Sequence, residues 1–204
     1  MSHDHSLPEH IPHSPEEKPF PVALSKLQLK NRIAIDAHTE RAITRFLYDE
    51  AELIDNMEWD DWLTCMHDDV YYWAPVRENR VARERKDEYY KQGTSVYFEE
   101  SKEFLRQRVY RLQTNMAWAE EPPSRSRHMI SNIRVDGRED GNFDVRSNFY
   151  IYRTRGERSQ DAIAGERRDI IVHAPDAPFG WLILHREIRF DMSTILVKNL
   201  SLFY

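Results

Sequence analysis

Apolar and polar residues alternate most regularly in the last third of the chain, where the pattern predicts four long strands. The expected strands cover residues 144–155, 162–173, 181–191 and 195–203. Side chains alternate there with a period of two, and β-branched and aromatic residues are frequent, as is typical of strands. In the third strand the pattern places on one face Leu182, Leu184, Ile188 and Phe190. Because sheets twist, strands of this length are expected to form a strongly curled sheet with a concave side.

Earlier in the chain the periodicity is helical. Apolar residues recur at three- and four-residue steps in three segments, which predicts helices over residues 36–55, 58–66 and 99–113. Asp36 is the expected N-cap of the first helix. Shorter strands are expected at residues 70–75, where a proline ends the run, and at 129–135. Helices followed by a run of strands indicate an α+β fold, in which the helices fill the concave side of the curled sheet.

The domain organisation follows from composition. Residues 1–30 contain five prolines between Pro8 and Pro21 and four histidines, so they are interpreted as an extended tail. Residues 31–204 are expected to form a single α+β domain. A chain of 204 residues is long enough for one domain with a sizeable core.

Charge and cysteine content narrow the class of protein. The net charge is −6 and both signs are mixed along the chain, which argues against a nucleic-acid-binding protein. The apolar runs are too short to span a bilayer, and the N-terminus has no apolar core of a signal peptide. The single cysteine, Cys65, has apolar neighbours and is interpreted as a buried small hydrophobe. We therefore expect a cytoplasmic protein without membrane contacts.

Candidate catalytic residues are few. There is no glycine-rich phosphate loop and no nucleophile elbow, and one cysteine is too few for an iron–sulfur cluster. Outside the tail, no two histidines have the spacing of a helical metal-binding pair. Acid–base chemistry in an enclosed pocket is open to His128, His185, Asp60, Asp69 and Tyr71. Each also has an ordinary structural interpretation: His185, for example, is expected within a strand, on the face opposite Leu182 and Leu184.

Charged residues gather in three places that are candidates for protein contacts. The segment 76–91 is either a solvated surface or a contact surface. Arg125 and Arg127 follow two prolines and would project to the same side of an extended segment. Residues 166–169 put four charges in a row within a strand, where buried charges must pair with one another or with a partner. A subunit interface and an exposed sheet face both account for this run.

Several segments together resemble the β (small) subunit of bacterial aromatic-ring-hydroxylating dioxygenases, the Rieske non-haem iron oxygenases, closest to the biphenyl, toluene and cumene branch. The resemblance covers about residues 34–204. It rests on residues 46–55, Trp59 with Trp62, and residues 75–80, 118–128, 130–132, 164–169 and 199–203.

The resemblance implies a cystatin-like (NTF2-like) fold, a curled mixed sheet around helices, and an α3β3 hexamer. The Rieske [2Fe–2S] cluster and the mononuclear iron would lie in the large α subunit, with no cofactor, metal or catalytic residue in this chain. The small subunits would form a trimer with a structural role. The family reaction is cis-dihydroxylation of an arene with O2 and electrons from NADH, delivered by a ferredoxin and its reductase that contact this chain only indirectly. The candidate interface residues are Arg77, Arg80, Trp118, Arg125, Arg127, Glu166, Arg167, Arg168 and Asp169.

A second hypothesis belongs to another class of protein. On the same fold, an independent isomerase or dehydratase could use His128 or His185 with an aspartate in its own pocket. The sequence does not identify the arene, because the determinants of substrate choice are expected in the large subunit.

Overall fold

The computed structural model describes residues 33–81, 88–90, 94–114, 124–156, 159–193 and 203–204. Within these residues there are three helices: α2 (Ala37–Asp55), α3 (Trp59–Thr64) and α4 (Lys102–Gln113). The six strands are β1 (Met66–Pro75), β2 (Val96–Glu100), β3 (Arg125–Gly137), β4 (Phe143–Arg155), β5 (Ser159–His173) and β6 (Trp181–Phe190). The predicted tail and the predicted strand at 195–203, except Phe203, lie outside the described residues.

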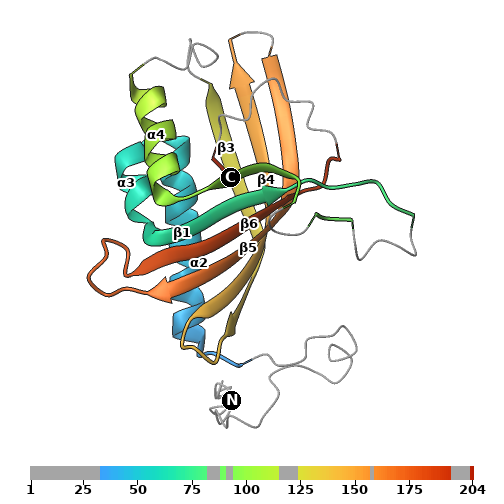
Figure 1. The fold of residues 1–204 in the computed structure, drawn as a ribbon. Coiled ribbons are helices and arrows are strands. Elements are labelled where there is room, and N and C mark those ends of the chain that lie inside the picture. The colour runs from blue at the N-terminus through green and yellow to red at the C-terminus, as the bar shows by residue number, and fades with distance from the viewer. Residues whose placement is uncertain (1–32, 82–87, 91–93, 115–123, 157–158, 194–202) are drawn as a thin grey trace, which may run out of the picture.

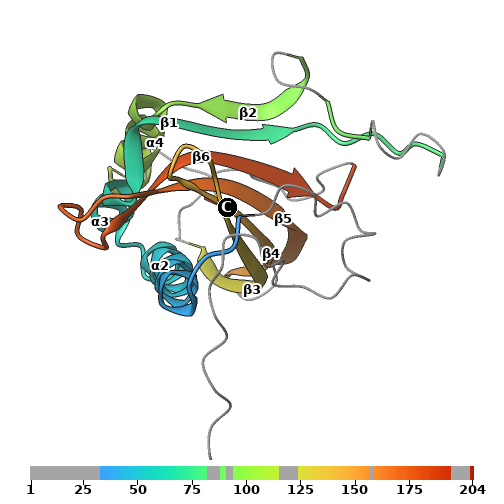
Figure 2. The same ribbon diagram turned by 90° about the horizontal axis from the view of Figure 1, so that it is seen from below.

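All six strands belong to one sheet in the order β2-β1-β6-β5-β4-β3. Neighbouring strands are antiparallel except β1 and β6, which are parallel, so the sheet is mixed. Figures 1 and 2 show the sheet curling around, with α2, α3 and α4 on its concave side. The predicted α+β architecture, with helices filling the concave side, is therefore confirmed.

Helix α2 is the main element packed on the sheet, and its predicted features are confirmed. The Asp36 carboxylate accepts a hydrogen bond from the Thr39 N–H at 2.9 Å, which caps the first turn. The apolar stripe at three- and four-residue spacing is buried: it consists of Ile43, Phe46, Leu47, Ala51 and Ile54. Each large side chain on such a stripe contributes about 1.5–3 kcal/mol by leaving water.

The long strands show the predicted alternation of buried and exposed side chains. In β4 the buried side chains are every second one, namely Val145, Ser147, Phe149, Ile151 and Arg153. The side chains between them face the convex side, where Tyr150 and Tyr152 are partly exposed. A twisted strand with this pattern has one face in the core and the other available to solvent or a partner.

Three predictions of detail are wrong. The helix predicted over residues 58–66 ends at Thr64, and Met66 already belongs to β1. Residues 96–100 form β2, so the helix predicted from residue 99 begins only at Lys102. In β6, the register shifts between Ile183 and His185 opposite Ile170 and Ile171 of β5. Because of this bulge, the buried residue is Ile183 rather than Leu182 or Leu184, whereas Ile188 and Phe190 are buried as predicted.

Candidate functional site

Four charged side chains lie inside the curled sheet. Glu50 of α2 accepts hydrogen bonds from Arg167 of β5 at 3.0 Å and from Arg186 of β6 at 2.8 Å. Arg186 also makes two bonds, both 2.9 Å long, to the Asp169 carboxylate. The Trp62 indole N–H donates to Glu50 at 2.9 Å. We call Glu50, Arg167, Asp169 and Arg186 the interior charge network.

Two members of the network, Glu50 and Arg186, keep each other charged. Burial raises the pKa of Glu50, but the guanidinium groups of Arg186 and Arg167 outweigh it and lower that pKa to about 2. For Arg186, burial lowers the pKa, yet Asp169 and Glu50 hold it well above its usual value. Burial and the nearby Arg186 lower the pKa of Arg167, and Glu50 opposes this. Glu50 and Arg186 therefore stay charged in the interior, where each depends on its oppositely charged partners.

Aromatic residues and the end of the sequence fill the space beside this network. Phe203 and Tyr204 are fully buried. The Phe203 ring lies 4.1 Å from the Trp62 ring, and the Tyr204 ring lies 4.9 Å from the Phe190 ring. The interior that could hold a pocket in a fold of this kind is occupied here by the chain's own side chains.

The acid–base candidate His128 does meet an aspartate. Its Nδ1 lies 2.6 Å from the carboxylate of Asp55 and its Nε2 lies 3.1 Å from the Phe203 carbonyl oxygen. The His128 side chain has no exposed area. Burial raises the pKa of Asp55, but the hydrogen bonds from His128 lower it by more, so the pKa lies below its ordinary value and this carboxylate is ionised. Both ring nitrogens thus have partners within the chain, and these contacts connect β3 to α2 and to Phe203.

The other acid–base candidates lie elsewhere and do not converge. His185 stacks on Tyr71 with ring centroids 5.5 Å apart, and burial lowers the pKa of His185. The Tyr71 hydroxyl donates to Glu99 at 2.6 Å. Asp60 accepts from Gln113 on α4, while Asp69 is exposed. His185 lies on the convex side, opposite the buried Ile188 and Phe190 as predicted, but because of the bulge in β6 Leu182 lies on that convex side too, which was not predicted.

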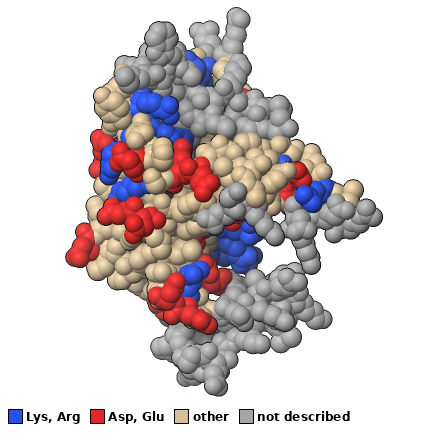
Figure 3. All heavy atoms as spheres, in the orientation of Figure 1, with Lys and Arg blue, Asp and Glu red and all other residues tan. Residues whose placement is uncertain are grey.

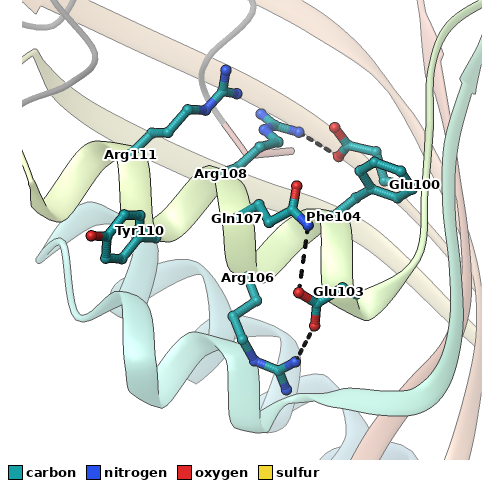
Figure 4. Close-up of a pocket in the computed structure, with 8 residues that line it drawn as sticks. All are labelled: Glu100, Glu103, Phe104, Arg106, Gln107, Arg108, Tyr110 and Arg111. Atoms are coloured by element: carbon teal, nitrogen blue, oxygen red, sulfur yellow. Dashed lines mark hydrogen bonds and ion pairs between the residues drawn. The ribbon is translucent and has the colours of Figure 1, made fainter.

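A hollow of about 620 Å³ is open on the outer side of α4 (Figure 4). It is lined by Glu100, Glu103, Phe104, Arg106, Gln107, Arg108, Tyr110 and Arg111. Its charged groups pair mainly with one another, as in the bonds from Arg106 to Glu103 and from Arg108 to Glu100, both 2.6 Å long. Figure 3 shows acidic and basic atoms interspersed over this side of the molecule. None of the acid–base candidates lines the hollow.

The charge run 166–169 is divided between the two faces of β5. The side chains of Arg167 and Asp169 are fully buried in the interior charge network, which removes them from any surface that a partner could contact. Glu166 and Arg168 lie on the convex face and pair with each other at 3.1 Å. The predicted interface role therefore narrows to Glu166 and Arg168 within this run.

The remaining predicted interface residues that the structure describes lie at or near the surface. Arg77 pairs with Glu88 at 3.1 Å and its guanidinium lies 5.6 Å from the centre of the Tyr89 ring. Arg80 pairs with Glu78 at 2.8 Å. On β3, both Arg125 and Arg127 are exposed, as their spacing predicts, and Arg127 lies 3.4 Å from Asp55. Trp118 lies outside the described residues.

Sequence reasoning missed Glu50 and Arg186, which complete the interior charge network. A signal was present, because Glu50 falls on the apolar stripe of α2, three residues after Leu47 and four before Ile54. Arg186 likewise falls between the buried residues Ile183 and Ile188. Charges on a predicted core face indicate a buried ion pair, but their spacing does not identify the partner.

Two further observations concern the described residues as a whole. Within them, no three His, Cys, Asp or Glu side chains lie close enough together to hold a metal ion. In the same part of the chain, no helix has the length and apolar character that crossing a membrane requires. Cys65 is buried, as predicted, and burial raises the pKa of its thiol.

Comparisons with known proteins identify the family. The model of the ring hydroxylating beta subunit family matches residues 49–197. Biphenyl 2,3-dioxygenase subunit beta of Rhodococcus jostii strain RHA1 is 36% identical over 171 residues, 83% of this chain and 91% of that protein. Chlorobenzene dioxygenase subunit beta of Cupriavidus sp. strain PS12 is 33% identical over 177 residues, 86% of this chain and 94% of that protein.

A solved structure supports the same conclusion at the level of the fold. Naphthalene 1,2-dioxygenase with indole bound in the active site superimposes with a TM-score of 0.74 at 24% identity, over 89% of this chain and 93% of that chain. The predicted cystatin-like (NTF2-like) fold and the predicted resemblance are both confirmed. The chain belongs to the ring hydroxylating beta subunit family.

Proposed function

We propose that this chain is the small β subunit of an aromatic-ring dioxygenase of the biphenyl, benzene and chlorobenzene type, and that it assembles the enzyme without performing the chemistry. The oxygenase is an α3β3 hexamer in which three copies of this chain form a trimer. It cis-dihydroxylates an arene with O2, in the cytoplasm, using electrons from NADH that a ferredoxin and its reductase deliver. The Rieske cluster and the mononuclear iron belong to the large α subunit.

The sealed His128–Asp55 pair is the observation that carries the non-catalytic role. A general base must reach its substrate directly or through one water molecule. Here both His128 ring nitrogens are engaged inside the chain, and the adjoining interior is filled by Phe203, Tyr204 and the interior charge network. A self-sufficient pocket enzyme would use His128 and Asp55 for catalysis. In this chain the two residues hold α2, β3 and residue 203 together.

The convex sheet face suits contacts with other subunits. Met129, Tyr150 and Tyr152 are exposed there as neighbours, since Met129 is paired in register with Tyr150. The ion pair of Glu166 and Arg168 lies beside them on β5. Aromatic residues and arginine are enriched at the centres of protein interfaces, and paired charges are typical of the rim.

Co-expression with a large subunit tests the proposal. We expect a complex whose mass, measured by light scattering, is three times the summed mass of the two chains. Dihydroxylation of biphenyl or benzene should require both chains together with ferredoxin, reductase and NADH. A small oligomer of this chain that ignores every large subunit, or arene turnover by this chain alone, would refute the assembly role.

A further inference from the structure

Side chains of three strands contact the main chain of Phe203 and Tyr204 in the interior. The Tyr72 hydroxyl accepts a hydrogen bond from the Tyr204 N–H and donates to the Tyr204 carbonyl oxygen, both at 2.7 Å. Arg186 donates to the same carbonyl at 3.2 Å, and His128 Nε2 lies 3.1 Å from the Phe203 carbonyl. Three side chains from β1, β3 and β6 thus contact the main chain of two residues.

The two aromatic rings occupy separate subsites. The Phe203 ring lies 4.1 Å from Trp62 and 5.6 Å from Trp59, and the Arg108 guanidinium lies 4.4 Å from its centre. The Tyr204 ring is surrounded by three other rings, those of Phe190, Phe98 and Phe149, at 4.9–6.3 Å. Main-chain recognition by fixed polar groups, with a pocket for each side chain, is how proteins bind extended peptides.

The polar groups that contact residues 203 and 204 are held in place by other partners. Arg186 makes two bonds to Asp169 and one to Glu50, all within the interior charge network. His128 is fixed by Asp55 at 2.6 Å. Because these partners are outside residues 203–204, the recognition groups stay oriented when the occupant changes, which is the condition for a preorganised binding site.

We propose that the concave interior of this chain is a recognition site for an extended peptide with two consecutive aromatic residues, and that its occupant is the chain's own Phe203–Tyr204. The pair acts as an intramolecular ligand that joins α3, α4 and the sheet. A chain in which this ligand is disabled binds the same peptide from solution. This inference is independent of the proposed assembly role, because it concerns the fold of the single chain.

The test uses the full chain with Phe203→Ala and Tyr204→Ala combined, and the synthetic peptide Asn-Leu-Ser-Leu-Phe-Tyr, which has the sequence of residues 199–204. We expect the double variant to unfold at a lower temperature than the unmodified chain. The peptide should raise this temperature in a saturable manner and bind in calorimetry, whereas the unmodified chain should not bind it. The peptide Asn-Leu-Ser-Leu-Ala-Ala should have no effect.

A matched variant separates recognition from the filling of any cavity. Phe46 is buried like Phe203 but lies on α2 next to Phe179, so Phe46→Ala opens the core without disabling the aromatic pair. The peptide should not stabilise this variant. A double variant that melts like the unmodified chain, or that is folded but gains nothing from the peptide, would overturn the proposal.

A second variant tests the proposal even if the double variant does not fold. Tyr72→Phe removes only the hydroxyl that bonds to both main-chain groups of Tyr204. When both chains are expressed with Tyr204 as their last residue, we expect carboxypeptidase to release it at least about tenfold faster from this variant than from the unmodified chain. Tyr97→Phe removes a hydroxyl that donates to Ser193 instead, and it should leave the release rate unchanged. Equal release from the Tyr72→Phe variant and the unmodified chain would also overturn the proposal.

Discussion

Strand β5 carries one arginine and one carboxylate on each of its faces, and the surroundings of the two sets differ. On the convex face, Arg168 and Glu166 pair at 3.1 Å with 42% and 32% of their side chains exposed. On the concave face, Arg167 and Asp169 are fully buried, and each pairs with a residue of another element, Glu50 of α2 or Arg186 of β6. Four adjacent charges thus serve two purposes, because the pleat sends them alternately outward and inward.

The comparison shows that surroundings decide what an ion pair contributes. An exposed pair contributes about 0–1 kcal/mol to folding, since water already solvates both partners. Removal of one partner from a buried pair costs about 3–5 kcal/mol, since the remaining charge has no substitute for water. The outer pair of Arg168 and Glu166 is therefore free to serve contacts with other subunits, whereas Arg167 and Asp169 are committed to the fold through Glu50 and Arg186.

The largest effect is expected from Glu50→Ala. This change leaves the guanidinium groups of Arg167 and Arg186 without the carboxylate they share, and it removes the acceptor of the Trp62 N–H. We expect the free energy of unfolding, measured in urea, to fall by about 3–5 kcal/mol. Glu166→Ala on the convex face is the control and should cost less than about 1 kcal/mol. Equal losses for the two variants would remove the distinction between the faces.

Acid should destabilise the chain by protonating Glu50. The folded-state pKa of Glu50 is about 2, below its ordinary value of 4.5, so the folded state binds the proton less readily than the unfolded state. The stabilisation is therefore complete above pH 4.5 and is lost as the pH falls toward 2. A shift of this size corresponds to roughly 3 kcal/mol.

Urea unfolding between pH 6 and pH 2.5 measures this loss. The Glu50→Gln variant should be less stable than the unmodified chain at neutral pH, and its stability should depend less on pH in this range. If the unmodified chain and this variant lost stability in parallel on acidification, other carboxylates would account for the acid sensitivity.

Gly165, also on β5, tests how closely the concave face is packed. A Cβ at this position would approach the Arg189 carbonyl oxygen and would lie 2.7 Å from Cζ of Phe149. Since backbone cannot yield as a flexible side chain does, Gly165→Ala should destabilise the chain by about 1–3 kcal/mol in thermal unfolding. Ala164→Ser, one residue away on the convex face, should change stability by less than about 0.5 kcal/mol. If Gly165→Ala left the stability unchanged, β5 and its neighbouring strands would have to be able to separate locally.

The sequence was informative where side chains alternate and silent where partners come from distant segments. Alternation in β4 and the stripe of α2 were enough to predict both elements and their buried faces. The bulge in β6 was not predictable from the sequence. One extra residue moves every earlier side chain of the strand to the opposite face, and nothing in the composition marks the place. The charge run 166–169 could be recognised as needing partners, but Glu50 lies more than a hundred residues away, and only the folded chain brings the two together.

The smallest effect on the fold, and the most direct test of the convex face, is expected from Arg168→Glu. A carboxylate at position 168 would lie beside Glu166 and opposite Glu187 of β6, so the paired charges of this face would become repulsive. The isolated chain should lose less than about 1 kcal/mol in urea unfolding, because the site is partly solvated. Assembly with the large subunit or with further copies of this chain should weaken at least about tenfold, because repulsion at an interface disfavours association. Light scattering of the co-expressed complex measures this, and Arg106→Glu in the exposed ion pair on α4 is the matched control. A complex that keeps its mass and affinity with Arg168→Glu would place the subunit contacts outside this face of β5.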